Sequence, residues 1–168
     1  MQRWLLGAAL ILGLGSMTLV TVAFAQPTGR VVEPSNAQLN FGHETMYDSF
    51  APVHEPGYGL FVMRHESWTM SVYLDRDPTS GCLLEWIRAG EVGDALGDGS
   101  LRYRAPHGAF YDRALGTVYN PDGVPIAGPG ERHLSEVPHT MPHNTVQVIE
   151  SEVRKAEPLS HGQRVCWD

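Results

Sequence analysis

Residues 58–75 read YGLFVMRHESWTMSVYLD and contain two segments of strand length on either side of a short turn. The segments 58–65 and 68–75 are rich in aromatic and aliphatic residues, and Glu66-Ser67 between them suits a hairpin turn. Clusters of Gly, Asp and Pro punctuate the rest of the chain, where further strands are expected at 82–88, 100–104, 109–112, 116–119 and 144–150. This pattern predicts an all-β fold, a small antiparallel sandwich or barrel.

The composition excludes several classes of protein. The chain has 168 residues, enough for one domain and a linker, and its 18 Gly and 12 Pro argue against a helical bundle or a coiled coil. The only expected helix is a short one around Glu91–Leu96. With 12 Lys+Arg against 19 Asp+Glu, a net charge of −7 and no basic block, the chain lacks the electrostatic footprint of a nucleic-acid binder.

The N-terminal stretch predicts export. Arg3 precedes an uncharged segment, residues 4–25, that ends in Ala23-Phe24-Ala25 before Gln26, as in a secretory signal peptide. The segment is longer than the roughly 7–15 apolar residues of a typical signal, and about 18 suffice to span a bilayer. Residues 1–25 are therefore interpreted as a signal peptide or an uncleaved membrane anchor. Both alternatives place the domain on the periplasmic or extracytoplasmic side.

The rest of the chain divides into two expected parts. Residues 26–57 are punctuated by Pro, Gly and Asn without clear periodicity, and we interpret them as a linker and an irregular N-terminal segment. Residues 58–168 form the expected β domain with a C-terminal extension. Cys82 and Cys166 are the two cysteines of the chain, and in an oxidising compartment they either form one disulfide or remain two unpaired thiols.

The stretch 81–134 carries the most specific pattern. It reads Gly-Cys-Leu-Leu-Glu-Trp at 81–86 and Ala-Pro-His-Gly-Ala-Phe-Tyr-Asp at 105–112, followed by Gly116, Gly128-Pro129 and Leu134. This order resembles the Rieske iron–sulfur domain of cytochrome bc-type complexes, in which a loop C-x-H-x-G-C-x-x-x-W is followed by C-P-C-H-G-S-x-Y-D. The resemblance implies a Rieske-like β fold.

The same resemblance implies a degenerate cluster site. Two thiolates and two imidazoles hold a Rieske 2Fe–2S cluster. The family's ligand positions fall at Asp77, Thr79, Arg104 and His107 in this sequence, and only His107 is a residue of the required type. We therefore expect no cofactor, and a salt bridge between Asp77 and Arg104 in the vacated space. Cys82 matches half of the family's loop-bridging disulfide, whereas Pro106 replaces its partner, so Cys82 is expected to pair instead with Cys166.

The function implied by the resemblance is that of a subunit. We expect an exported, membrane-associated accessory domain of a respiratory, quinol-oxidising complex of the cytochrome b type, acting structurally without a cluster. The alternative is a functional 2Fe–2S electron carrier with atypical ligands. No nucleophile elbow, Walker loop or HExxH motif occurs, so no self-contained catalytic site is expected, and at most the chain is an electron-transfer subunit of an oxidoreductase.

A second alternative is a copper-binding module. Residues 138–143 read Pro-His-Thr-Met-Pro-His and offer two imidazoles, His139 and His143, and the thioether of Met141. Imidazole and thioether ligands suit copper, and an exported chain can encounter that metal.

Overall fold

The computed structural model describes residues 36–156 and residue 166, and the expected signal or anchor at residues 1–25 lies outside them. The described elements follow one another as β1 (Gln38–His43), η1 (Glu44–Met46), β2 (Val53–Glu55), β3 (Leu60–Arg64), β4 (Met70–Leu74), β5 (Leu84–Arg88), α2 (Val92–Ala95), α3 (Leu101–Arg104), β6 (Gly108–Asp112), β7 (Thr117–Tyr119), β8 (Pro125–Ala127), β9 (His139–Thr140), η2 (Pro142–Asn144), β10 (Thr145–Ile149) and α4 (Glu150–Ala156).

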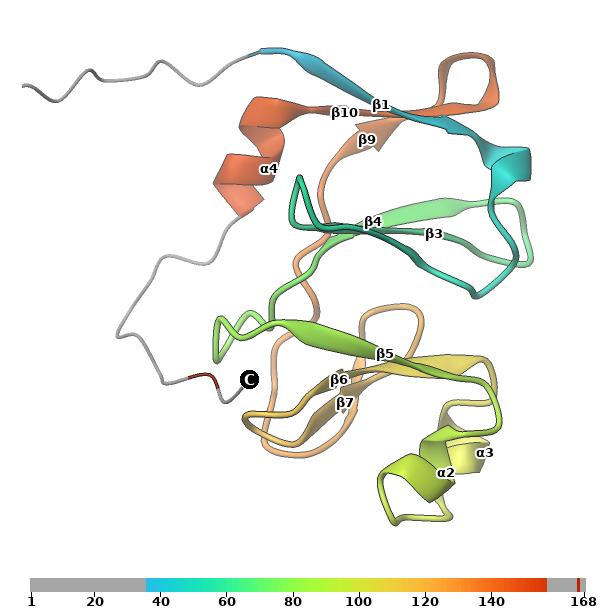
Figure 1. Cartoon of the computed structure of the whole chain (residues 1–168), viewed down its shortest axis with the longest axis vertical. Coiled ribbons are helices and arrows are strands. Elements are labelled where there is room, and N and C mark those ends of the chain that lie inside the picture. The colour runs from blue at the N-terminus through green and yellow to red at the C-terminus, as the bar shows by residue number, and fades with distance from the viewer. Residues whose placement is uncertain (1–35, 157–165, 167–168) are drawn as a thin grey trace, which may run out of the picture. The chain divides into compact units, whose positions relative to one another are not determined.

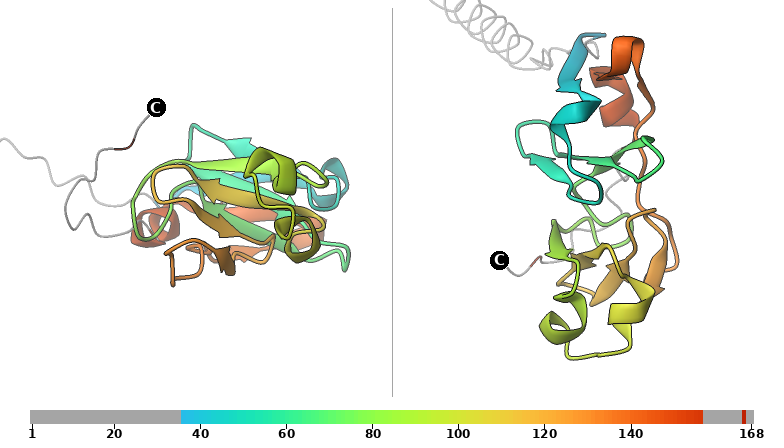
Figure 2. Two further views of the ribbon diagram at one scale, coloured as in Figure 1. Left: turned by 90° about the horizontal axis from the view of Figure 1, so that it is seen from below. Right: turned by 90° about the vertical axis from the view of Figure 1, so that its right-hand side faces the viewer.

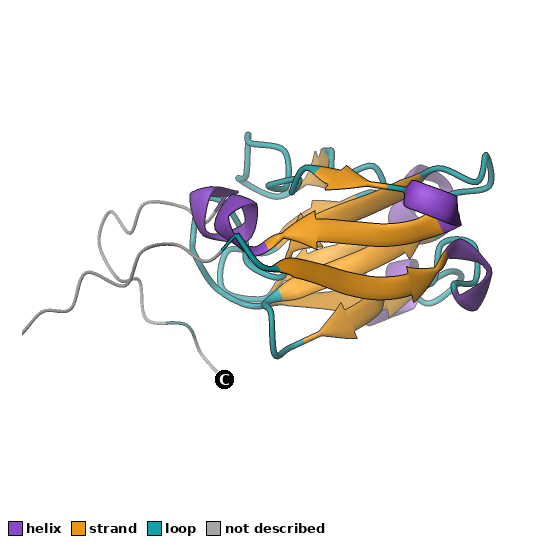
Figure 3. Ribbon diagram, turned by 90° about the horizontal axis from the view of Figure 1, so that it is seen from above, coloured by secondary structure: helices purple, strands orange, loops and turns teal. Residues whose placement is uncertain are grey.

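These strands form three antiparallel sheets, which confirms the all-β class. The sheet orders are β1-β10-β9, β2-β3-β4 and β5-β6-β7-β8. Figure 1 shows the three sheets one after another, and Figure 3 shows the strands stacked with the short helices at their margins. The right-hand view of Figure 2 gives the same succession from a further side.

The middle sheet is buried on both faces because β3 carries a continuous apolar run. Leu60 and Val62 pack into a cluster shared with the β1-β10-β9 sheet, whereas Phe61 and Met63 pack toward Phe110 of β6. Side chains alternate between the two faces of a strand, so four consecutive apolar residues give a strand that contacts a layer on each side. The first strand of the hairpin predicted at residues 58–75 therefore lies at the centre of the domain.

The outer face of the β5-β6-β7-β8 sheet is covered by the segment between β5 and β6. Val92 of α2 and Leu101 of α3 pack against Ala109 and Val118 of that sheet. The helix expected near Glu91–Leu96 is confirmed as α2.

Two expectations about secondary structure, one for residues 100–104 and one for residues 26–57, are wrong. The segment 100–104 forms α3 rather than a strand, because the carboxylate of Asp98 accepts from the backbone N–H of Ser100 at 2.9 Å and starts a helical turn. The interval 26–57, expected to be linker and irregular chain, contains β1 and β2. In β1, Leu39 and Phe41 pack on the core between polar residues, an alternation that the neighbouring Gly and Pro residues obscure.

No helix among the described residues has both the length and the apolar character needed to cross a bilayer.

Candidate functional site

Loop 77–82, which leads into β5, encloses the carboxylate of Asp77. Oδ1 accepts from the backbone N–H groups of Thr79 and Ser80, each at 2.7 Å, and the hydroxyl of Tyr119 donates to Oδ2. The backbone closes the loop as well, because the N–H of Asp77 donates to the carbonyl of Cys82. Asp77 is fully buried. Three groups of the protein itself thus donate to this carboxylate.

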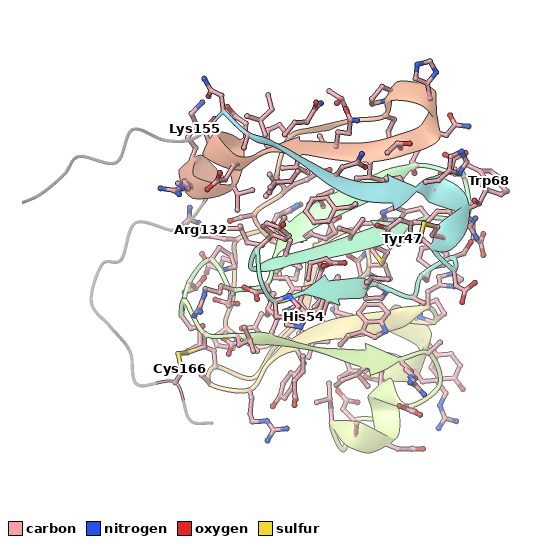
Figure 4. All side chains as sticks on the ribbon, turned by 45° about the horizontal axis from the view of Figure 1, so that its top comes forward. Tyr47, His54, Trp68, Arg132, Lys155 and Cys166 are labelled. Carbon is pink, nitrogen blue, oxygen red and sulfur yellow. A yellow bond between two sulfur atoms is a disulfide. The ribbon has the colours of Figure 1, made fainter. Side chains whose placement is uncertain are left out.

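A disulfide joins this loop to Cys166, near the C-terminus. The Cys82 and Cys166 Cα atoms lie 5.5 Å apart, within the range that a disulfide requires, and their Sγ atoms are bonded. This confirms the expected pairing and excludes the alternative of two free thiols. Figure 4 shows the bond beside the label of Cys166.

Asp77 belongs to a buried polar group that we call the sealed cluster: Asp77, Ser80, Asp112, Thr117 and Tyr119. Oδ1 of Asp112 accepts from the backbone N–H of Ala114 at 2.8 Å, and its buried Oδ2 has no hydrogen-bond partner among the described residues. Burial, reinforced by the negative charge of Asp77, raises the pKa of Asp112 above its usual value. Burial likewise raises the pKa of Tyr119, which keeps that phenol protonated as a donor to Asp77.

The other two positions aligned with Rieske ligands lie at the opposite end of the sheet. Strands β5 and β6 are antiparallel, with Leu84 opposite Asp112 and Arg88 opposite Gly108, so loop 77–82 and residues 104–107 flank opposite ends of this hairpin. Four residue steps of a strand span about 13 Å. Figure 1 shows the same separation, with α2 and α3 at the end away from the loop before β5.

Arg104 is exposed, and it makes no ion pair with the buried Asp77 in the described part of the chain. The predicted Asp77–Arg104 salt bridge is therefore wrong. The reason is topological, because the pairing of β5 with β6 places Arg104 at the end of the hairpin away from loop 77–82. His107, also exposed, stacks on Phe50 with ring centroids 4.2 Å apart and planes at 18°.

These positions do not fit a 2Fe–2S cluster. One cluster needs its four ligands together, with thiolates on one iron and imidazoles on the other. Here Asp77 is enclosed by its own loop, Thr79 and Arg104 supply neither a thiolate nor an imidazole, and His107 lies at the other end of the sheet. The one cysteine of the loop, Cys82, is held in the disulfide.

The three residues considered for copper lie around β9 and η2. His139 approaches the Val137 carbonyl through Nδ1 at 3.4 Å, Met141 packs against the apolar cluster of the first two sheets, and His143 is exposed with a φ of 51°. The part of the chain that the structure describes holds no group of three or more His, Cys, Asp or Glu suited to a metal ion.

A polar hollow of about 500 Å³ lies beside the β3–β4 turn, and we call it the His65 pocket. His65 follows β3, and Ser71 lies opposite Met63 in β4, so the period-two alternation of the strands places both side chains on one face. His65 Nε2 lies 3.0 Å from Ser71 Oγ, and His65 Nδ1 lies 3.5 Å from Asp122 Oδ1. The wall of the pocket consists of Phe50, Glu66, Ser67, Thr69, Met70, Tyr73 and Glu136 in addition to these three residues.

The turn between β7 and β8 positions Asp122. The side-chain oxygen of Asn120 accepts from the N–H groups of Asp122 and Val124, at 3.1 and 2.9 Å. Gly123 has a φ of +73°, and a Cβ there would lie 3.1 Å from the ring of Tyr73. The turn therefore packs closely over Tyr73 and presents Asp122 to His65. The sequence did not predict this site, because Ser71 and Asp122 are 51 residues apart and the residues of the site share no motif.

A scan against models of protein families finds no match to this chain, and a search of curated proteins finds none either.

Proposed function

We propose that the chain is an exported Rieske-like domain that acts as a structural accessory subunit of a membrane electron-transfer assembly and carries no cluster of its own. The observation that supports the cluster-free role is the enclosure of Asp77, whose buried carboxylate accepts hydrogen bonds from Thr79, Ser80 and Tyr119. The assignment to a quinol-oxidising, cytochrome b-type complex rests on the resemblance of residues 81–134 to the Rieske domain.

The disulfide supports export. Bonds of this kind persist in oxidising compartments such as the bacterial periplasm and are rare in the cytosol. The pairing of Cys82 with Cys166 is therefore consistent with the signal or anchor expected at residues 1–25.

A surface for association lies at the end of the domain away from the disulfide. Large apolar side chains are exposed there on η1, on the β3–β4 turn and on α3: Met46, Trp68 and Tyr103, the last 86% exposed. Phe50 links these elements, because it contacts both His65 and His107. Exposed aromatic side chains with a polar surround are typical of surfaces that bind a partner protein.

The cluster-free role is tested by composition. The full chain, purified from cells whose iron–sulfur assembly machinery is intact, is expected to be colourless and to contain no stoichiometric iron or sulfide. About two irons and two sulfides per chain, with a Rieske-type electron paramagnetic resonance signal, would instead establish the electron-carrier alternative.

The accessory role is tested by co-purification from detergent-solubilised membranes. We expect a cytochrome b-type subunit to accompany the tagged wild-type chain and to be lost with Trp68→Glu/Tyr103→Glu. Leu83→Glu is the matched control, since Leu83 is also half exposed but lies beside the disulfide. Purification of the wild-type chain without any membrane cytochrome would overturn this role.

A further inference from the structure

In the His65 pocket, a hydroxyl, an imidazole and a carboxylate follow one another in a chain of contacts. Ser71 Oγ is 3.0 Å from His65 Nε2, and the other ring nitrogen is 3.5 Å from Asp122 Oδ1. In the tautomer with its proton on Nδ1, on the side of Asp122, His65 has the Nε2 lone pair free to accept from the serine hydroxyl. A nucleophile, a base that reaches it and a group that orients the base define a serine hydrolase site by geometry rather than by sequence order.

We propose that Ser71, His65 and Asp122 form an acyl-transfer site that hydrolyses small carboxylic esters bearing a positive charge. This activity is separate from the accessory role proposed above and does not depend on it.

The chemistry follows from the contacts. Ser71 Oγ attacks the ester carbonyl and transfers its proton to His65 Nε2, while Asp122 stabilises the resulting imidazolium. The bond from the carbonyl carbon to the leaving oxygen breaks, and His65 returns the proton to that oxygen, releasing the alcohol. Water then attacks the acyl-serine in the same manner, which releases the carboxylic acid and regenerates the serine hydroxyl.

Tyr73 supplies a donor for the oxygen that becomes negative. It lines the pocket and lies two residues after Ser71 in β4, on the same face of the strand. Burial raises the pKa of Tyr73 to about 12, so the phenol stays protonated at neutral pH and can donate to a developing oxyanion.

The charge of the pocket selects the substrate. Three carboxylates line it, those of Glu66, Asp122 and Glu136, in a chain whose net charge is −7. A hollow lined by one sign of charge concentrates ligands of the opposite sign. The pocket is therefore suited to an ester with a cationic group and unsuited to an anionic one.

Three phenyl acetates test the activity on the full disulfide-bonded chain: cationic 4-(trimethylammonio)phenyl acetate, neutral phenyl acetate and anionic 4-acetoxybenzoate. We expect kcat/KM to fall in that order at low salt, and Glu136→Gln to reduce the preference for the cation. Ser71→Ala and His65→Asn are each expected to lower kcat/KM about 100-fold or more. Ser49→Ala is the matched control, because Ser49 lies near the same end, outside the pocket, and only accepts from Arg64.

Covalent labelling separates catalysis from a structural role of the His65–Ser71 hydrogen bond. A fluorophosphonate probe is expected to lose fluoride and attach to Ser71, to label His65→Asn far more slowly, and to leave Ser71→Ala unlabelled although that variant melts near the wild-type temperature. The proposed site is overturned if the wild type takes no label and hydrolyses none of the esters, if the label falls on another residue, or if Ser71→Ala retains wild-type kcat/KM. Equal rates on the three esters would overturn the cationic substrate class.

Discussion

The two ends of the β5–β6 hairpin use the same kinds of side chain in opposite ways. At the disulfide end, the Asp77 carboxylate is fully buried and accepts from two backbone N–H groups and a phenol. At the other end, the Asp122 carboxylate is 67% exposed and faces His65 across an open pocket. A buried carboxylate that accepts from its own loop and from a neighbouring phenol is closed to a ligand from solvent, whereas one at the edge of a hollow can act on what enters it.

Removal of the disulfide is expected to have the largest effect on stability among the changes that compare the two ends. It closes a separation of 84 residues, for which the chain-entropy model gives about 4.5 kcal/mol of stabilisation. We expect Cys166→Ser to lower the free energy of unfolding by about that amount in urea denaturation, and reduction of the wild type to reproduce the loss.

Hydrogen exchange then locates the effect of the disulfide. Amides of loop 77–82 are expected to exchange faster in Cys166→Ser, while those of the β3–β4 turn change only in proportion to global stability. Equal midpoints for the oxidised and reduced wild type would contradict a stabilising role.

Substitution of Asp77 and of Asp122 compares the stability contributed by a carboxylate at each end. Asp77→Ala removes the acceptor of two backbone N–H groups and leaves the buried Tyr119 hydroxyl without its partner, so we expect a loss of about 3 kcal/mol. Asp122→Ala, at the exposed position, is expected to cost less than about 1 kcal/mol. Thermal and urea unfolding of both variants measure the difference, and equal losses would show that the sealed cluster is no more structural than the pocket.

Two glycines provide a finer comparison of the same ends. Gly108 has a φ of +106°, and a Cβ there would lie 2.4 Å from the Trp86 ring, whereas Gly81 has a φ of +74° and no atom within 4 Å of such a Cβ. We expect Gly108→Ala to cost about 2 to 3 kcal/mol through strain and overlap, and Gly81→Ala about 1 kcal/mol through strain alone. Urea denaturation of the pair tests this, and a smaller loss at Gly108 than at Gly81 would refute it.

The fold class could be predicted from the sequence because its signals are local. The apolar run of β3 and the turn signals between strands gave the correct class, and the short helix α2 was found as well. The segment 100–104 is a helix rather than the expected strand because the side chain of the preceding Asp98 begins the helical turn.

The arrangement of the site could not be predicted, because it depends on where distant segments meet. The alignment of His107 with a ligand position depended on order along the chain, whereas the pairing of β5 with β6 places that residue at the end of the sheet away from loop 77–82. Ser71 and Asp122 likewise meet only because β4 and the β7–β8 turn pack together around Tyr73. No spacing in the sequence encodes such a contact.

The smallest expected effect concerns Asp112, the member of the sealed cluster with an unpartnered oxygen. Because its pKa is raised in the folded state, the folded chain binds more protons than the unfolded chain once the pH exceeds the ordinary aspartate value of about 3.9. Its contribution to stability is therefore fully present below about pH 4 and is lost as the pH rises through the raised folded value. The charge it then carries is buried beside Asp77.

Asp112→Asn keeps an oxygen that can accept from Ala114 and removes this charge. We expect the variant to remain within about 1 kcal/mol of the wild type at pH 7 and to gain stability relative to it between pH 4 and pH 7, since only the wild type ionises there. Urea denaturation of both proteins at several pH values measures the difference. A difference that stays constant across the range, or that shifts in favour of the wild type as the pH rises, would show that Asp112 ionises in the folded chain as readily as in the unfolded one, and that the disulfide end of the sheet is open to water after all.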